Sequence, residues 1–183
     1  MHKGKIHLPD FQRGWVWDDN RIKGIIASVA KSFPIGAVML LETGNESIRF
    51  KTKPVEGAPN NGTKPELLIL DGQQRITSLY QAIITNQVVT TRNAKNYEIK
   101  RWYYIDMVKA LDPDTDLEEA IFSINENKII TENIGRDIVL DLTTEEQEFK
   151  NLMYPVCMVD EYDDWRTKFS EYWDYDKEKI KFW

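Results

Sequence analysis

Hydrophobic residues recur at helical spacing in two segments of the chain. In each segment they fall at i, i+3, i+4, i+7 and i+8, which places them on one face of an α-helix. The first set is Ile22, Ile25, Ile26, Val29 and Ala30, and the second is Ile76, Leu79, Tyr80, Ile83 and Ile84. Asp18 or Asp19 is a suitable N-cap for the first helix, and Pro34 ends it. The second helix begins at Gln73 and ends near Asn86.

Shorter apolar runs predict the strands. Residues 35–42 (IGAVMLLE) and 67–70 (LLIL) have the composition of buried strands, whereas residues 47–53 (SIRFKTK) suit a partly exposed one. Further strands are expected in 97–107, 120–125 and, as a strand or extended piece, 154–159. A short helix capped by a threonine is expected within 143–153. The order of elements predicts an α+β fold, a mixed sheet with flanking helices.

Composition changes at Asp160, where the chain becomes acidic and aromatic. Four aromatic positions in this last part share a helical stripe: Tyr162, Trp165, Phe169 and Tyr172 or Trp173. Such a stripe is typical of core packing, yet little sequence follows it. We therefore expect one domain over residues 1–159 and, over 160–183, the beginning of a helical region whose packing partners lie further on in a longer protein.

Charge and cysteine content narrow the function classes. The 183 residues carry a formal net charge of −6, which is not the composition of a general DNA-coating protein, although a local basic site remains possible. The single cysteine, Cys157, cannot form an internal disulfide and is expected to be a small buried hydrophobe. Neither a signal peptide nor a run of transmembrane length is visible. We expect a cytoplasmic protein without membrane partners.

The segment DGQQR, Asp71 to Arg75, places unusual polarity where a buried strand meets a helix. Unpaired helix amides and the positive end of the dipole favour an anion there. Arg75 adds a fork suited to phosphate, Gln73 and Gln74 can hold a ligand or a water, and Asp71 can bind a divalent metal. The alternative is a plain helix start, capped by Asp71 and carrying a solvated polar face.

The segment FQRGWVW, residues 11–17, holds a second Gln–Arg pair, Gln12 and Arg13, among aromatic residues. Trp15 and Trp17 can stack a base, or they can pack over the first helix. Basic residues alternate in residues 47–53, so they share one strand face that suits either a phosphate backbone or solvent: Arg49, Lys51 and Lys53. The repeated Gln–Arg pair suggests that the two segments converge on one pocket.

Together these motifs resemble the N-terminal domain of GmrSD-type restriction enzymes, a family with a ParB/sulfiredoxin-like fold that is named for its DGQQR motif. The resemblance rests on LPDFQRGWVWDDNRIKGIIASV (8–29), FPIGAVMLLE (33–42), LLILDGQQRITSLYQAI (67–83) and RWYYIDM (101–107), in that order. MYPVCMV (153–159) also fits. The match covers most of residues 5 to 110.

The resemblance implies a nucleotide-binding and hydrolysing regulatory domain of a bacterial, type IV-like defence system against phage or foreign DNA. It implies GTP or ATP with Mg²⁺ as ligand, DNA, possibly modified, as partner, and an HNH-type nuclease domain in the same or a partner chain. No HNH pattern occurs in these 183 residues. Carried over by motif, one set of residues would form the nucleotide site: Gln12, Arg13, Pro34, Gly36, Asp71, Gly72, Gln73, Gln74 and Arg75.

Three functions therefore compete. The first is a nucleoside triphosphatase in which Asp71, Gln73, Gln74 and Arg75 act on the phosphates and Asp71 holds Mg²⁺. The second is a DNA-recognition module without catalysis, in which Gln12, Arg13, the tryptophans and the basic strand face contact DNA. The third is a nuclease in its own right, like some ParB-fold enzymes. Nucleotide and DNA binding assays separate the first two.

Overall fold

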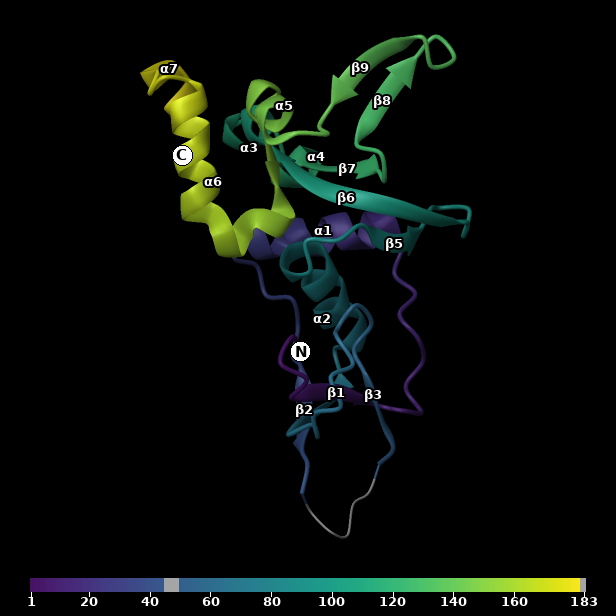
Figure 1. The fold of residues 1–183 in the computed structure, drawn as a ribbon. Helices are drawn as coiled ribbons and strands as arrows, with labels where there is room; N and C mark the ends of the chain where they lie inside the picture. Colours follow the sequence, from purple (N-terminus) through teal and green to yellow (C-terminus); the bar gives the residue numbers. More distant parts are fainter. Residues whose placement is uncertain (45–49, 182–183) are drawn as a thin grey trace.

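The computed structural model describes residues 1–44 and 50–181. The N-terminal half builds a four-stranded sheet in the order β2-β4-β1-β3, at the bottom of Figure 1. Its strands are β1 (Ile6–Pro9), β2 (Met39–Glu42), β3 (Thr52–Pro54) and β4 (Leu67–Asp71). β1 and β4 run parallel, while the β1–β3 and β2–β4 pairs are antiparallel. The sheet is therefore mixed, as predicted.

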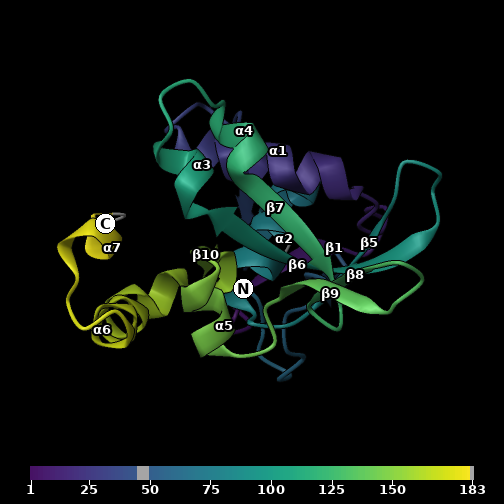
Figure 2. The ribbon, with the colours of Figure 1, turned by 90° about the horizontal axis from the view of Figure 1, so that it is seen from above.

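A second sheet forms around one long strand, β6 (Glu98–Asp106), in the upper half of Figure 1. β6 pairs antiparallel with β5 (Val89–Arg92), β7 (Ile121–Asn125) and β10 (Met153–Pro155). β8 (Ile129–Glu132) and β9 (Asp137–Asp141) make a separate hairpin. Figure 2 shows this hairpin on one side of the second sheet and the helix α6 (Tyr162–Tyr172) on the other.

Helices cover the second sheet and join it to the first. The long ones are α1 (Asp19–Ala30), α6 (Tyr162–Tyr172) and the continuous pair α2 (Gln73–Leu79) and η1 (Tyr80–Ile84), the latter a π-helix. The short ones are α3 (Met107–Leu111), α4 (Leu117–Ala120), α5 (Glu145–Lys150), the 3-10 helix η2 (Val156–Glu161) and α7 (Lys177–Ile180). The predicted N-cap of α1 is confirmed, since the Asp18 side chain accepts from Arg21 N. The α+β class is confirmed as well.

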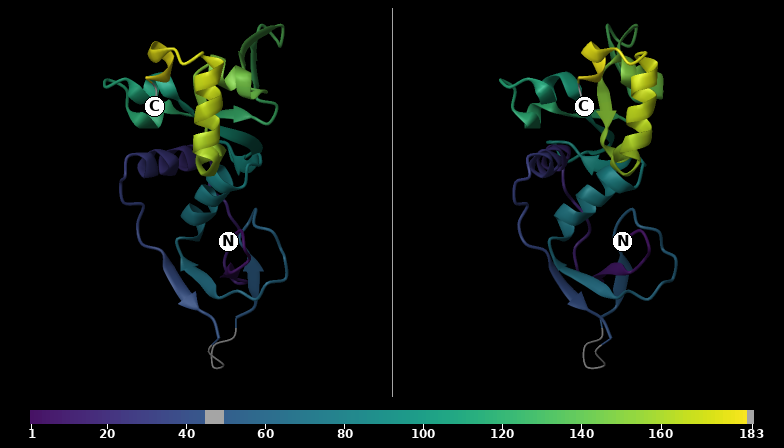
Figure 3. Two further views of the ribbon diagram at one scale, coloured as in Figure 1. Left: turned by 60° about the vertical axis from the view of Figure 1, so that its left-hand side comes forward. Right: turned by 90° about the vertical axis from the view of Figure 1, so that its left-hand side faces the viewer.

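Three segments connect the two sheets, and we call this region the waist. The first linker (residues 10–18) runs from β1 to α1, and the second linker (residues 31–38) returns from α1 to β2. The third connection is α2–η1, which leads from β4 to β5. Figure 3 shows the second linker descending beside α2 toward β2. The arrangement of the whole molecule therefore depends on how these three segments are held together.

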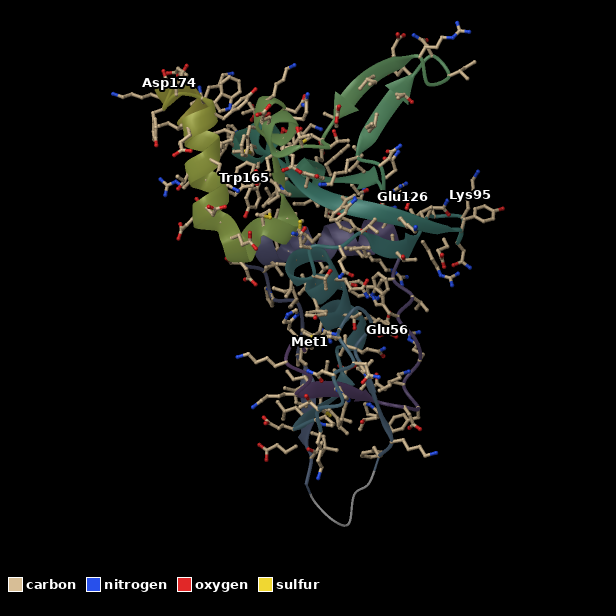
Figure 4. All side chains as sticks on the ribbon, viewed as in Figure 1. Met1, Glu56, Lys95, Glu126, Trp165 and Asp174 are labelled. Atoms are coloured by element: carbon tan, nitrogen blue, oxygen red, sulfur yellow. The ribbon has the colours of Figure 1, made fainter. Side chains whose placement is uncertain are left out.

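Two predictions about burial are wrong. Residues 35–42 are not a buried strand: only Met39–Glu42 form β2, which lies at a sheet edge and leaves Met39 59% exposed. The aromatic stripe beyond Asp160 has packing partners within this chain, since Trp165 and Phe169 are fully buried against Phe149. Figure 4 marks Trp165 between α6 and the second sheet. The division at residue 159 remains an expectation.

Several elements carried no clear pattern in the sequence. β1, which holds the centre of the first sheet with β4, is four residues long, and β5 and the β8–β9 hairpin were not predicted. Within 154–159 only the first two residues are in a strand, and the rest turn into η2. Residues 47–49, the first three of the strand predicted over 47–53, lie outside the described residues. None of the helices in the described ranges is long and apolar enough to cross a membrane.

Candidate functional site

The DGQQR segment begins where β4 ends. Gly72 occupies the N-cap position of α2 in a left-handed conformation (φ 88°), which glycine adopts without strain. No side chain caps this helix start, so the alternative in which Asp71 serves as the cap is wrong. A Cβ at Gly72 would lie 3.1 Å from Val38 and 3.3 Å from Arg75, so the turn leaves little room. Asp71 instead points its carboxylate outward and is 72% exposed.

Gln73 and Gln74 hold the first linker. Gln74 is buried and uses both ends of its amide, since Nε2 donates to Gly14 O (3.1 Å) and Oε1 accepts from Val16 N (2.9 Å). Gln73, also buried, donates from Nε2 to Arg13 O at 2.8 Å. These bonds satisfy backbone groups of a segment that has no regular ladder of its own. The two glutamines therefore attach the first linker to α2.

Gln12 completes the attachment from the opposite direction. Its Nε2 donates to Ile69 O (2.9 Å) and to Leu70 O (2.8 Å), at the end of β4. Its own carbonyl accepts from Lys53 Nζ at 2.6 Å. The predicted convergence of the two Gln–Arg segments is thus present, and backbone carbonyls mediate most of it.

Arg75 holds the second linker. Its guanidinium donates from Nη1 to Ile35 O and from Nη2 to Ala37 O (2.8 Å), and Nη2 lies 3.4 Å from Asp71 Oδ2. Gly36 between those carbonyls has φ 87°, and a Cβ there would lie 2.0 Å from Arg75 Nη1. Gly36 therefore shapes the turn around Arg75. Neither Pro34 nor Gly36, both expected in the nucleotide site, lines the cavity described next.

A cavity of about 290 Å³ lies between the first linker and the start of α2, and we call it the Arg13 cavity. Gln12, Arg13 and Trp17 line it from the linker, and residues 70–75 line it from β4 and α2. Small-molecule sites usually have volumes of about 300–1,000 Å³. The cavity is therefore of a size to hold part of a nucleotide, such as its phosphates, rather than the whole molecule.

The two arginines of this cavity differ in their free hydrogen-bonding capacity. Arg75 uses two nitrogens on backbone carbonyls, and its side chain is only 23% exposed. Arg13 is exposed, and its guanidinium forms neither a hydrogen bond nor an ion pair with any described residue. A guanidinium presents five N–H donors. All the N–H donors of Arg13 are therefore available to an anion, whereas Arg75 can offer only the N–H groups that it does not donate to the two backbone carbonyls.

The two tryptophans expected to contact DNA mainly pack within the protein. Trp15 donates from Nε1 to Ser78 Oγ at 2.9 Å, and both Trp15 and Trp17 pack against the core under α1. Lys51 is exposed, as expected for a surface contact, while Arg49 lies outside the described residues. Phe11, the first aromatic residue of the FQRGWVW segment, is 66% exposed. Its ring meets edge to face the ring of Phe50 (40% exposed), which the sequence did not suggest, with centroids 5.5 Å apart.

The fit to a divalent metal rests on Asp71 alone. Among residues 1–44 and 50–181 there is no group of three or more His, Cys, Asp or Glu side chains that could hold a metal ion. Mg²⁺ is commonly bound through one or two carboxylates together with substrate phosphates, so Asp71 fits as the single protein ligand of a metal–nucleotide complex.

Burial raises the pKa of the Cys157 thiol to about 11, which keeps it protonated and inert at neutral pH.

The fold is that of a small α+β domain with a polar cavity at its waist. The chain matches the family described as the GmrSD restriction endonuclease N-terminal domain over residues 1–181, and it belongs to that family. It is also 34% identical over 131 residues to an uncharacterised protein of Methanocaldococcus jannaschii. That alignment covers 69% of this chain and 22% of the relative, so the chain spans about a fifth of the length of the curated relative it matches.

Proposed function

We propose that the domain binds a nucleoside triphosphate, GTP or ATP with Mg²⁺, in the Arg13 cavity and hydrolyses it as the regulatory part of a type IV-like restriction protein that acts against phage or foreign DNA. The observation that carries the proposal is that Arg13, exposed and without a hydrogen bond or ion pair from its guanidinium to any described residue, lines one cavity together with the DGQQR turn. Family membership supports the restriction context. The proposal includes a ParB/sulfiredoxin-like fold.

In this proposal, each charged residue of the cavity has a different role in binding the triphosphate. Arg13 pairs with phosphate oxygens through a bidentate fork, and the donors that Arg75 retains neutralise developing charge. Asp71, which is exposed, would share a divalent metal with the phosphates. Bound Mg²⁺ would supply further neutralisation of the triphosphate charge.

Gln73 is the better suited of the two glutamines to position an attacking water. Its Nε2 is used on Arg13 O, but its Oε1 accepts no hydrogen bond from the described residues. Gln74 uses both amide ends on the linker backbone, so its contribution is to hold the cavity wall. Because the same residues tie the first linker to α2, ligand binding and hydrolysis would bias the waist, and through it a cutting domain such as an HNH nuclease in the same or a partner chain.

The test is calorimetric titration of the purified chain with Mg-GTP and Mg-ATP, followed by phosphate-release assays. We expect binding, slow hydrolysis, and loss of hydrolysis in Arg75→Ala. Arg136→Ala is the matched control, since Arg136 is an exposed arginine in the β8–β9 turn, far from the cavity (Figure 1). An unchanged hydrolysis rate in Arg75→Ala, or no binding of either nucleotide by the wild-type chain, contradicts the proposal.

A second candidate function is DNA recognition, favoured by one surface. Phe11 and Phe50 expose an aromatic pair, and Arg13 and Lys51 lie on the same two segments, which are joined by the bond from Asp10 N to Lys51 O (2.9 Å). Exposed aromatics beside cations bind nucleic acid by stacking and phosphate contacts. Titration with plain and modified DNA at two salt concentrations tests it: affinity that falls with salt and is lost in Phe11→Ala supports this function.

A further inference from the structure

A second and larger cavity, of about 400 Å³, lies farther along the waist, and we call it the Glu56 cavity. Its walls come from residues 15–17 of the first linker, from the loop after β3, from η1 and from β5. Trp17 lines both cavities, so the two lie next to each other along the first linker. Its volume falls within the range of small-molecule sites, and nothing in the triphosphate proposal uses it.

The wall of this cavity contains a carboxylate whose hydrogen bonds are incomplete. Glu56 Oε1 accepts from Trp15 N at 3.1 Å, but Oε2 is enclosed and has no hydrogen-bond partner in the described part of the chain. Glu56 also forms no ion pair with a described residue. Buried carboxylate oxygens normally receive donors, and leaving one without a donor is costly. Figure 4 marks Glu56 at the waist, beside α2.

The other walls suit a flat ring with polar edges. The indole of Trp15 is fixed by its bond to Ser78 Oγ, and the backbone of Trp17 is fixed because its carbonyl accepts from Thr91 Oγ1 at 2.7 Å. The Trp15 ring is held in this way, and both tryptophans line the cavity, so they offer aromatic surface for stacking a planar ring. Gln87 lines the cavity with an exposed amide that makes no hydrogen bond to the described residues.

We infer that the Glu56 cavity binds a guanine base. Guanine places two N–H donors side by side, N1–H and the 2-amino group, and these match a carboxylate acceptor; O6, next to N1, can accept from the Gln87 amide. In adenine, cytosine and uracil, each N–H donor on the base-pairing edge lies next to an acceptor, either a ring nitrogen or a carbonyl oxygen. When one carboxylate oxygen accepts from that donor, the other is repelled by the neighbouring acceptor. Because Glu56 Oε2 is enclosed, the carboxylate must turn toward the cavity before this oxygen accepts from the base the donor that it lacks.

Nucleosides test this inference apart from the triphosphate proposal, because they carry no phosphate. The wild-type chain is titrated with guanosine, inosine and adenosine while the indole N–H signals of Trp15 and Trp17 are followed by NMR. We expect guanosine to bind at least about tenfold more tightly than inosine, which lacks the 2-amino group. Arg13→Ala should leave guanosine affinity within about twofold, so failure of the triphosphate site does not affect this result.

Glu56→Gln is the decisive variant. It keeps an oxygen for Trp15 N–H but replaces one acceptor with a donor, so guanosine should bind about tenfold more weakly and its advantage over inosine should vanish. Glu66→Gln, an exposed site that pairs only with Lys5, is the matched control. Gln87→Ala, at an exposed position, adds a variant that folds normally and should still weaken guanosine. If no nucleoside binds, or if Glu56→Gln keeps the preference, the inference is overturned.

The guanine base can come from a free nucleotide or from a nucleic acid, and a further binding experiment distinguishes these two sources. Guanosine is compared with a short single-stranded oligodeoxynucleotide that contains one guanine and with a matched strand that contains none. Binding of guanosine alone identifies a free nucleotide as the ligand. Tighter binding of the guanine strand than of either other probe identifies a base presented by nucleic acid. Equal binding of the two strands, with no response to guanosine, contradicts a guanine site.

Discussion

The two Gln–Arg pairs at the waist have the same residue types, but their arginines are used differently. In the DGQQR turn, Gln74 and Arg75 are largely enclosed and donate to backbone carbonyls of the two linkers. In the first linker, Gln12 is likewise fixed to the end of β4, but Arg13 is exposed and unpaired within the described residues. One arginine therefore organises the cavity, and the other is available to what enters it.

The difference shows that one motif can have both a structural role and a ligand-binding role. A run of polar residues at a strand-to-helix junction looks like a ligand site, and here it is first of all a clamp that joins three chain segments. Because the clamp forms the walls of the Arg13 cavity, the proposed function predicts that damage to it lowers both stability and nucleotide binding. It predicts that loss of the Arg13 side chain lowers nucleotide binding alone. The following substitutions separate these effects, from the largest expected change in stability to the smallest.

Arg75→Ala should lower the free energy of unfolding by about 3 kcal/mol. The change removes two charge-assisted bonds to the second linker and leaves the carbonyls of Ile35 and Ala37 without their donors. Urea unfolding followed by tryptophan fluorescence measures it. A loss below about 0.5 kcal/mol, the range of ordinary surface substitutions, means that Arg75 does not hold the second linker.

Gln74→Ala should lower the free energy of unfolding by about 2 kcal/mol, because it removes the bonds to Gly14 O and Val16 N from a buried site. Gln87→Ala, at an exposed glutamine, is the matched control and should change stability by less than about 0.5 kcal/mol. Hydrogen exchange gives a second readout, since the Val16 amide should lose protection in Gln74→Ala only. If both variants lose the same free energy of unfolding, Gln74 does not hold the first linker.

Gly36→Ala should cost about 1 to 2 kcal/mol, since a side chain is strained at φ 87° and the new Cβ meets the locked Arg75 guanidinium. Thermal unfolding measures the loss. Gly62→Ala is the matched control: Gly62 also has a positive φ (70°), but nothing lies within 4 Å of its added Cβ. A larger loss at Gly36 than at Gly62 isolates the contact with Arg75 from the backbone strain that both share.

Arg13→Ala should change the free energy of unfolding by less than about 0.5 kcal/mol, because its guanidinium contacts no described partner. Its affinity for Mg-nucleotide should nonetheless fall at least about tenfold, since a charge-assisted contact to phosphate is lost. The two measurements are made on one preparation. A stability loss comparable with that of Arg75→Ala would mean that the two arginines do not differ as described.

Periodicity was sufficient to predict α1 and the helix that starts at Gln73, and apolar runs and strand-forming composition were sufficient to predict the strands at 67–70 and around 98–106. The convergence of the two Gln–Arg segments was predictable because the pairs repeat. The partners of Gln73, Gln74 and Arg75 were not, because they are backbone carbonyls, which leave no signature in a sequence. The exposure of β2 depends on its place at a sheet edge, and Phe50 meets Phe11 only after β1 and β3 pair.

The most direct test is calorimetric titration of Mg-GTP and Mg-ATP into the wild-type chain, Arg13→Ala and Arg136→Ala under identical conditions. We predict that wild type and Arg136→Ala bind at least one of the nucleotides equally well, and that Arg13→Ala binds it at least about tenfold more weakly while unfolding at the same temperature. Equal binding by all three chains, or no binding by any of them, would contradict a triphosphate site built around Arg13 and the DGQQR turn.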